Sequence, residues 1–152
     1  MNDIYSKLYT DMAAHIAENM PEITWIDLYL GQDQTNLRPA LAYPAVLIDF
    51  DRVTYSQTGM NNQFAELQMT VRLFLDNYAS SAQKTSDKSK RASLSYFSLA
   101  KKLSETIHGY QPNDGYTQPL VRVSQSFQNR NDIGLRIVTT TFTTSFEEYI
   151  SF

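Results

Sequence analysis

The chain has 152 residues, a formal net charge of −3 and no cysteine. This length suits one domain with one modest core, so we expect a single domain over residues 1–152. The acidic balance argues against a general nucleic-acid-binding protein, which needs a basic surface to displace counterions from phosphates. The lack of cysteine excludes disulfides, thiolate metal ligands and a thiol nucleophile.

The sequence carries no sign of export or membrane insertion. Met1 is followed by Asn2 and Asp3 rather than by a basic patch and an apolar run. No segment approaches the roughly 20 apolar residues of a bilayer span. We therefore expect synthesis in the cytoplasm, a soluble product and no membrane partner.

The first predicted element is an amphipathic helix over residues 4–20. Its apolar stripe has helical spacing and consists of Ile4, Leu8, Met12 and Ile16, with Tyr5 and Tyr9 beside it. Asn2 or Asp3 can cap the first turn, and Pro21 ends the helix. Residues 23–30 are rich in β-formers and predict a short strand at an edge of the sheet.

The next two predicted strands form a hairpin. Pro44 introduces the apolar run 45–48, which is typical of a strand covered on both faces, and the turn-forming residues 56–62 follow it. Within residues 64–75 apolar and polar residues then alternate, which predicts a long strand with one apolar and one polar face. The apolar face consists of Ala65, Leu67, Met69, Val71, Leu73 and Leu75, and the polar face of Glu66, Gln68, Thr70 and Arg72.

A long polar loop is predicted at about residues 77–92. It is almost free of apolar residues and gathers Lys84, Lys88, Lys90 and Arg91 in an otherwise acidic chain. A loop of this length inside a compact domain is usually functional or disordered, so we expect these four residues to meet a partner. A plain solvated loop that runs into the following helix is the alternative.

The remaining elements are a second helix and a second hairpin. The helix covers residues 93–108 and ends at Gly109, and strands follow at 120–127 and 135–146. In the last strand, Thr139, Thr141 and Thr143 line one uncharged face, and we expect a neighbouring subunit to cover part of it. The predicted fold is α+β, a mainly antiparallel sheet of two β-hairpins packed against two α-helices.

No catalytic, cofactor or metal site is predicted. His15 and His108 lack a two-histidine ligand spacing, and Asp49 with Asp51 has no third acid nearby to complete a cation site. The chain has no glycine-rich nucleotide loop and no nucleophile elbow. We therefore expect a protein that is not an enzyme.

The element order, together with the phrases 43–50 (YPAVLIDF) and 67–73 (LQMTVRL), resembles the tail-terminator or tail-completion family of long-tailed bacteriophages. The resemblance covers nearly the whole chain but contains no diagnostic motif. It implies a virion protein that forms a ring, usually a hexamer, on the head-proximal end of the tail tube. Such a ring halts tube polymerisation and offers a docking surface to the head's connector, while DNA passes through its lumen without sequence-specific binding.

The resemblance and the residue patterns suggest interface residues. A ring needs heterologous contacts, which exposed strand edges and helices can supply. The candidates are Glu66, Gln68 and Arg72, the three outward threonines, and the basic residues of the polar loop.

Two further interpretations remain open. Another head–tail neck or connector protein would share these features. A small-ligand-binding or regulatory module would instead hold its ligand in a pocket lined by the polar face of residues 64–75.

Overall fold

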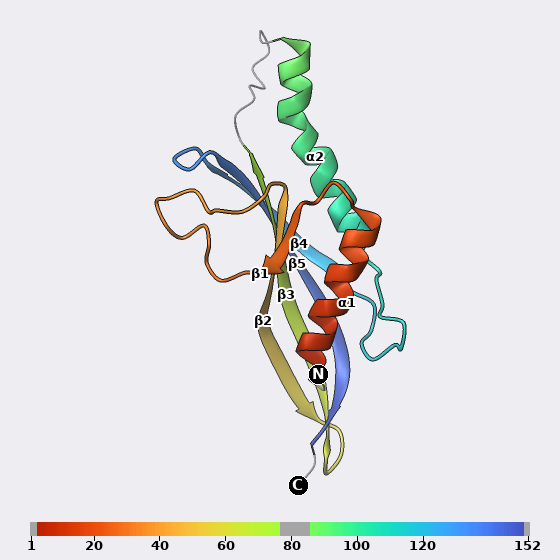
Figure 1. Cartoon of the computed structure of the whole chain (residues 1–152). Coiled ribbons are helices and arrows are strands. Elements are labelled where there is room, and N and C mark those ends of the chain that lie inside the picture. The colour runs from red at the N-terminus through yellow and green to blue at the C-terminus, as the bar shows by residue number, and fades with distance from the viewer. Residues whose placement is uncertain (1–2, 77–85, 151–152) are drawn as a thin grey trace.

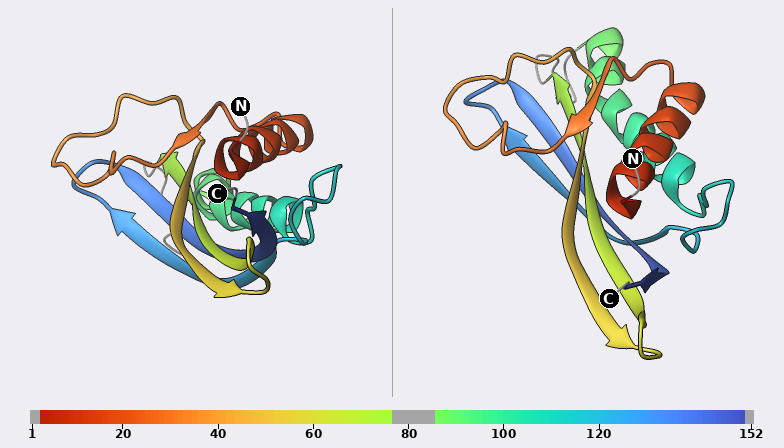
Figure 2. Two further views of the ribbon diagram at one scale, coloured as in Figure 1. Left: turned by 90° about the horizontal axis from the view of Figure 1, so that it is seen from below. Right: turned by 60° about the horizontal axis from the view of Figure 1, so that its bottom comes forward.

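The computed structural model describes residues 3–76 and 86–150, and it has the predicted α+β fold (Figure 1). Five strands form one open sheet in the order β1-β2-β3-β5-β4. The elements in chain order are α1 (Ile4–Asn19), β1 (Trp25–Leu28), β2 (Ala45–Gln57), β3 (Asn62–Asp76), α2 (Asp87–Ile107), β4 (Val121–Arg130) and β5 (Leu135–Tyr149). Both helices lie on the same face of the sheet, and the β2–β3 hairpin extends well beyond them (Figures 1 and 2).

The sheet consists of two antiparallel hairpins joined through their long inner strands. β2 pairs with β3, β4 pairs with β5, and β3 pairs with β5 along its whole length, all antiparallel. The short β1 is an edge strand, and it runs parallel to β2 beside Ala45–Ile48. β2 beyond Ile48 therefore has no strand on its outer side within the described chain.

α1 forms as its sequence predicts. The Asp3 carboxylate accepts a hydrogen bond from the Ser6 backbone N–H at 2.7 Å and caps the first turn. Leu8, Met12 and Ile16 are buried against the sheet. Neither helix has both the length and the apolar character needed to cross a bilayer, within the residues described.

α2 begins earlier than predicted. Ser86 is its N-cap, and its hydroxyl accepts from the Ser89 N–H at 3.2 Å. The helix therefore starts at Asp87 rather than at residue 93, and Lys88, Lys90 and Arg91 belong to its first two turns, not to a loop. A serine cap followed by good helix formers explains this start despite the lack of apolar residues. Lys84 and the rest of the predicted loop at 77–85 lie outside the described residues.

The main core lies between the helices and the sheet. The alternation predicted for β3 is confirmed. The side chains of its predicted apolar face are buried in this core, while Glu66 and Gln68 on the other face are exposed. β5 follows the same rule: Val138, Phe142 and Phe146 point into this core. The final strand is longer than predicted and continues to Tyr149.

A second apolar cluster lies on the opposite face of the sheet, so the expectation of a single core is wrong. Its buried members are Ala45, Leu47, Phe74, Ile133, Leu135 and Ile137. The segment after β1 covers this cluster with the side chains of Tyr29, Leu41 and Tyr43. Burial on both faces explains the continuous apolar run 45–48, as the sequence predicted.

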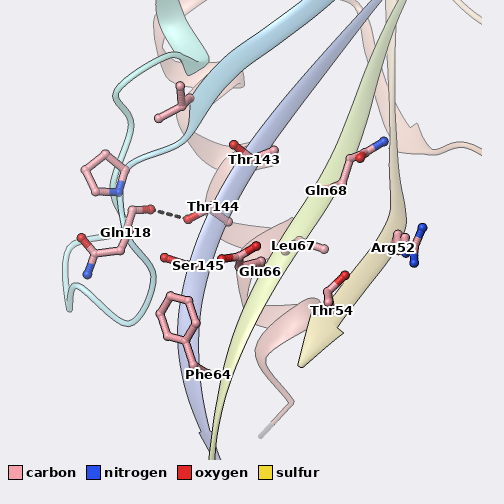
Figure 3. Close-up of a pocket in the computed structure, with 12 residues that line it drawn as sticks. Arg52, Thr54, Phe64, Glu66, Leu67, Gln68, Gln118, Thr143, Thr144 and Ser145 are labelled. Atoms are coloured by element: carbon pink, nitrogen blue, oxygen red, sulfur yellow. Dashed lines mark hydrogen bonds between the residues drawn. The ribbon is translucent and has the colours of Figure 1, made fainter. Parts of the chain in front are cut away.

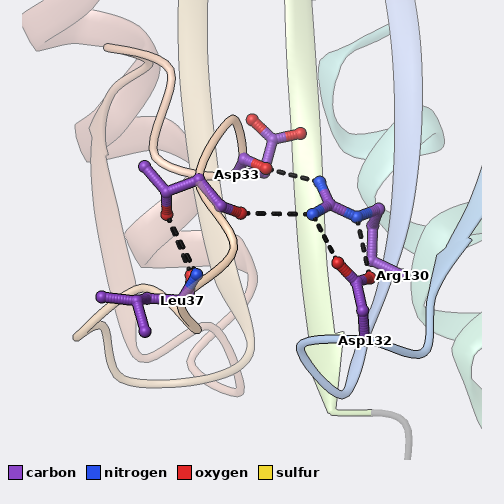
Figure 4. A network of polar contacts seen from close by, with 5 residues as sticks. Asp33, Leu37, Arg130 and Asp132 are labelled. Carbon is purple, nitrogen blue, oxygen red and sulfur yellow. Dashed lines mark hydrogen bonds and ion pairs between the residues drawn. The ribbon is translucent and has the colours of Figure 1, made fainter.

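Two arginines attach this covering segment to the β4–β5 hairpin. Arg130 donates to the backbone carbonyls of Asp33 and Thr35 and also binds the Asp132 carboxylate at 2.9 and 3.0 Å (Figure 4). Arg38 donates to the carbonyl of Gly134 at 2.8 Å and pairs with Asp76. These bonds join segments almost a hundred residues apart and hold the cover over the second core.

Candidate interaction surface

The sheet face opposite the helices is polar beyond the second core, and it brings most of the predicted interface residues together. In the register of β3 and β5, Arg72 lies beside Thr139, and Gln68 lies beside Thr143. Thr141 stands between these pairs, and Glu66 faces Ser145. We call this area the polar face. It consists of Glu66, Gln68, Arg72, Thr139, Thr141 and Thr143.

An open hollow of about 470 Å³ lies on the polar face (Figure 3). Its wall includes Glu66, Gln68 and Thr143 together with Arg52 of β2 and the Phe64 ring. The ligand-binding alternative required all four polar residues on this face of β3 to line a pocket. Thr70 and Arg72 do not line the hollow, so that expectation is met only in part.

Arg72 and Thr70 are instead engaged in contacts at the border of the second core. The Arg72 guanidinium lies 3.8 Å from the centre of the Tyr29 ring and 3.7 Å from Asp49. Thr70 belongs to the predicted polar face of β3 but is buried, and its hydroxyl donates to the Asp51 carboxylate. Burial and the neighbouring Asp51 carboxylate raise the pKa of Asp49 above its ordinary value. Of all predicted interface residues on the sheet, Arg72 is the one most involved in holding the fold.

The basic residues do not join the polar face. Lys88, Lys90 and Arg91 lie on α2, which packs on the opposite side of the sheet. Lys88 and Arg91 are exposed there. The members of the predicted set that the structure describes therefore divide between the two faces of the sheet.

A third surface was missed by the sequence reasoning. Phe97 of α2 and Phe127 of β4 are about half exposed, and their ring centres are 5.8 Å apart. The centre of the Tyr96 ring lies 4.0 Å from that of Phe97 and 6.4 Å from that of Phe127. We call this group the aromatic patch. The signal was present in the sequence: Phe97 lies outside the apolar stripe of its helix, and Phe127 lies on a strand with few other apolar residues.

The aromatic patch borders an open strand edge. β4 is the last strand of the sheet, and nearly all its residues are exposed. Within residues 3–76 and 86–150 no strand pairs with its outer side. At the opposite edge of the sheet, the lower part of β2 from Asp49 to Gln57 is likewise unpaired on its outer side within the described residues. Unpaired edges of this kind are templates for pairing with another chain.

No protein-family model and no curated protein sequence matches the chain. The surfaces therefore have to be interpreted from their own chemistry.

Both histidines take part in packing. The His15 ring stacks on Tyr110 at 4.1 Å, and its Nε2 lies 2.9 Å from the Thr106 carbonyl oxygen. The Nδ1 of His108 accepts a hydrogen bond from the Arg122 backbone N–H at 3.0 Å. Among the residues that the structure describes, no three histidine or acidic side chains are grouped as metal ligands would be. What the site offers is contact area, comprising two open edges, an aromatic patch and a polar face.

Proposed function

We propose that the chain is a tail-terminator protein of a long-tailed bacteriophage. Copies of it assemble into a ring, most simply a hexamer, on the head-proximal end of the tail tube. The ring stops polymerisation of the tube and joins the tail to the head connector, and DNA passes through its lumen. In this role the protein is a structural component of the virion.

The observation that carries this proposal is that the sheet has an unpaired strand edge at each of its two ends. A ring requires that one surface of a subunit fit a different surface of the next, and closure then removes both from solvent. β4 and the lower part of β2 are two such different surfaces. The polar face is uncharged along Thr139, Thr141 and Thr143, as suits a surface that contacts protein or lets DNA pass.

Electron microscopy of tail tubes mixed with the purified chain tests this proposal. The expected result is a ring at one end of each tube, and tubes that stop growing when the chain is added. Genes for the major tube protein and the head connector next to this one would support the same role. Binding at the neck but never at bare tube ends would favour the alternative of another head–tail connector protein.

A second candidate function rests on the hollow beside Phe64. Its volume lies within the range of small-molecule sites, and an aromatic ring with Glu66, Gln68 and Arg52 around it could hold a polar ligand. A screen of small polar compounds by thermal shift tests this candidate. A ligand that stabilises the wild type but not a Phe64→Ala variant would support it.

A further inference from the structure

We infer that β4 of one copy pairs antiparallel with the lower part of β2 in the next copy, so that one sheet continues across the subunit boundary. The inference deepens the proposed function and rests on it, because the partner is a second copy of this chain. It names the two surfaces that meet and the direction in which the strands run.

Strand direction favours this pairing. β2 and β5 run the same way, since each is antiparallel to β3, and β4 runs against β5. A second copy that continues the sheet with the same face and direction therefore brings β4 against β2 in antiparallel fashion. Antiparallel pairing is the slightly more stable of the two ladders.

The other edge strand, β1, is a poorer template for pairing. It is only four residues long, and short edge strands resist pairing with another chain. The backbone N–H of Leu28 donates to the Asp27 carboxylate at 2.8 Å, and its carbonyl accepts from the Gln32 side chain at 3.0 Å. Both backbone groups of Leu28 therefore already have partners within the chain.

Two bulges leave matching regular stretches on the two edges. The register of β2 with β3 shifts at Asp51, and the register of β4 with β5 shifts at Val123. The regular stretches that remain are Arg52–Gln57 on β2 and Ser124–Arg130 on β4, which are of similar length. A bulge disturbs the ladder locally, so we expect pairing within these stretches. The pairing requires the two copies to be staggered along the strand direction, as tilted strands in a closed sheet are.

Apolar side chains on the two edges match. Phe127 points to the helix side of the sheet, as does Tyr55 on β2, and both are about half exposed. Joining the edges places these exposed rings on the same side of the continued sheet. The charged side chains within the two regular stretches are Arg52 and Arg130, and Arg130 already forms an ion pair with Asp132 of its own chain.

The lack of native cysteine allows a direct test by cross-linking. Thr54 and Ser126 are exposed, lie within the two regular stretches and point to the same face of the sheet. We would prepare the single variants Thr54→Cys and Ser126→Cys and treat each alone, and then their mixture, with a short bismaleimide. Glu18→Cys, an exposed position on α1 away from both edges, serves as the matched control.

The expected result is a covalent dimer from the mixture, with about tenfold less from either variant alone, because the contact joins unlike surfaces. Mixing Glu18→Cys with Ser126→Cys should give no such product. The reaction is irreversible and accumulates even brief encounters, so failure to form the mixed dimer at high protein concentration would overturn the inference.

The same experiment separates this inference from the proposed function. Rings seen by electron microscopy without the mixed cross-link would leave the function standing and refute the edge pairing. A chain carrying both Thr54→Cys and Ser126→Cys should give a ladder of products that ends at the number of subunits in the ring. A ladder without an end would support the edge pairing but contradict a closed ring.

Discussion

The second core makes a strong prediction about stability. Phe74 is fully buried on the face of the sheet opposite the helices, where it packs with Leu47 and Ile137 beneath the segment after β1. Replacing Phe74 by alanine removes most of a buried ring and leaves a cavity. Substitutions of this kind cost about 3–5 kcal/mol in well-packed cores. For a domain of this size the melting temperature should fall by about 6–20 °C.

Unfolding in urea, followed by circular dichroism, measures the loss in free energy of unfolding as a shift of the urea midpoint. The measurement is made at low protein concentration so that self-association does not add to the apparent stability. Leu37→Ala is the control, because Leu37 belongs to the same covering segment but is 77% exposed. Its effect should stay within about 0.5 kcal/mol.

The size of the Phe74→Ala effect decides whether the second cluster is a true core. A loss below about 1 kcal/mol would mean that the segment after β1 does not pack tightly over the sheet. The bonds of Arg38 and Arg130 between that segment and the sheet would then be incidental. A loss in the expected range would show that both faces of the upper sheet contribute to stability.

Three further predictions concern local interactions. Ser86→Ala removes the N-cap of α2 and should lower the free energy of unfolding by about 1 kcal/mol, with a loss of helical circular dichroism; an unchanged variant would contradict a helix start at this residue. Tyr116→Phe removes a 2.5 Å hydrogen bond to the Asp11 carboxylate and should cost about 1 kcal/mol by the same denaturation assay, while no loss would show that water replaces the bond. The raised pKa of Asp49 means that ionisation of its carboxyl penalises the folded state, so Asp49→Asn should be more stable than the wild type at neutral pH and lose that advantage below the unfolded pKa of 3.8. Denaturation at several pH values checks this, and a variant that is less stable at neutral pH would refute the assigned cause.

The sequence was sufficient for the elements with strong periodicity. The alternation of residues 64–75 identified which side of β3 is buried, and the threonine alternation did the same for β5. These predictions are confirmed where one face of each strand meets the main core and the other does not, which leaves a period of two in the sequence. Where both faces are buried, as at Phe74 and Ile137, the alternation is lost.

Other features depend on contacts between distant segments and left a weaker trace. The cover of the second core is an irregular segment held by Arg38 and Arg130, and no periodicity marks such a segment. The start of α2 was missed because its first two turns are polar and extend past the core, so only the Ser86 cap indicated them. The aromatic patch arises where Phe97 meets Phe127, and neither position predicts the other without the fold.

We propose that copies of this chain join head to tail through unlike edges and close into a ring. The most direct test is to measure the mass of the assembled species by light scattering and to view the same sample by electron microscopy, with and without tail tubes. We expect one species with a fixed number of subunits, seen as closed rings in solution or at tube ends. A protein that stays monomeric at every concentration and never associates with a tube would contradict it.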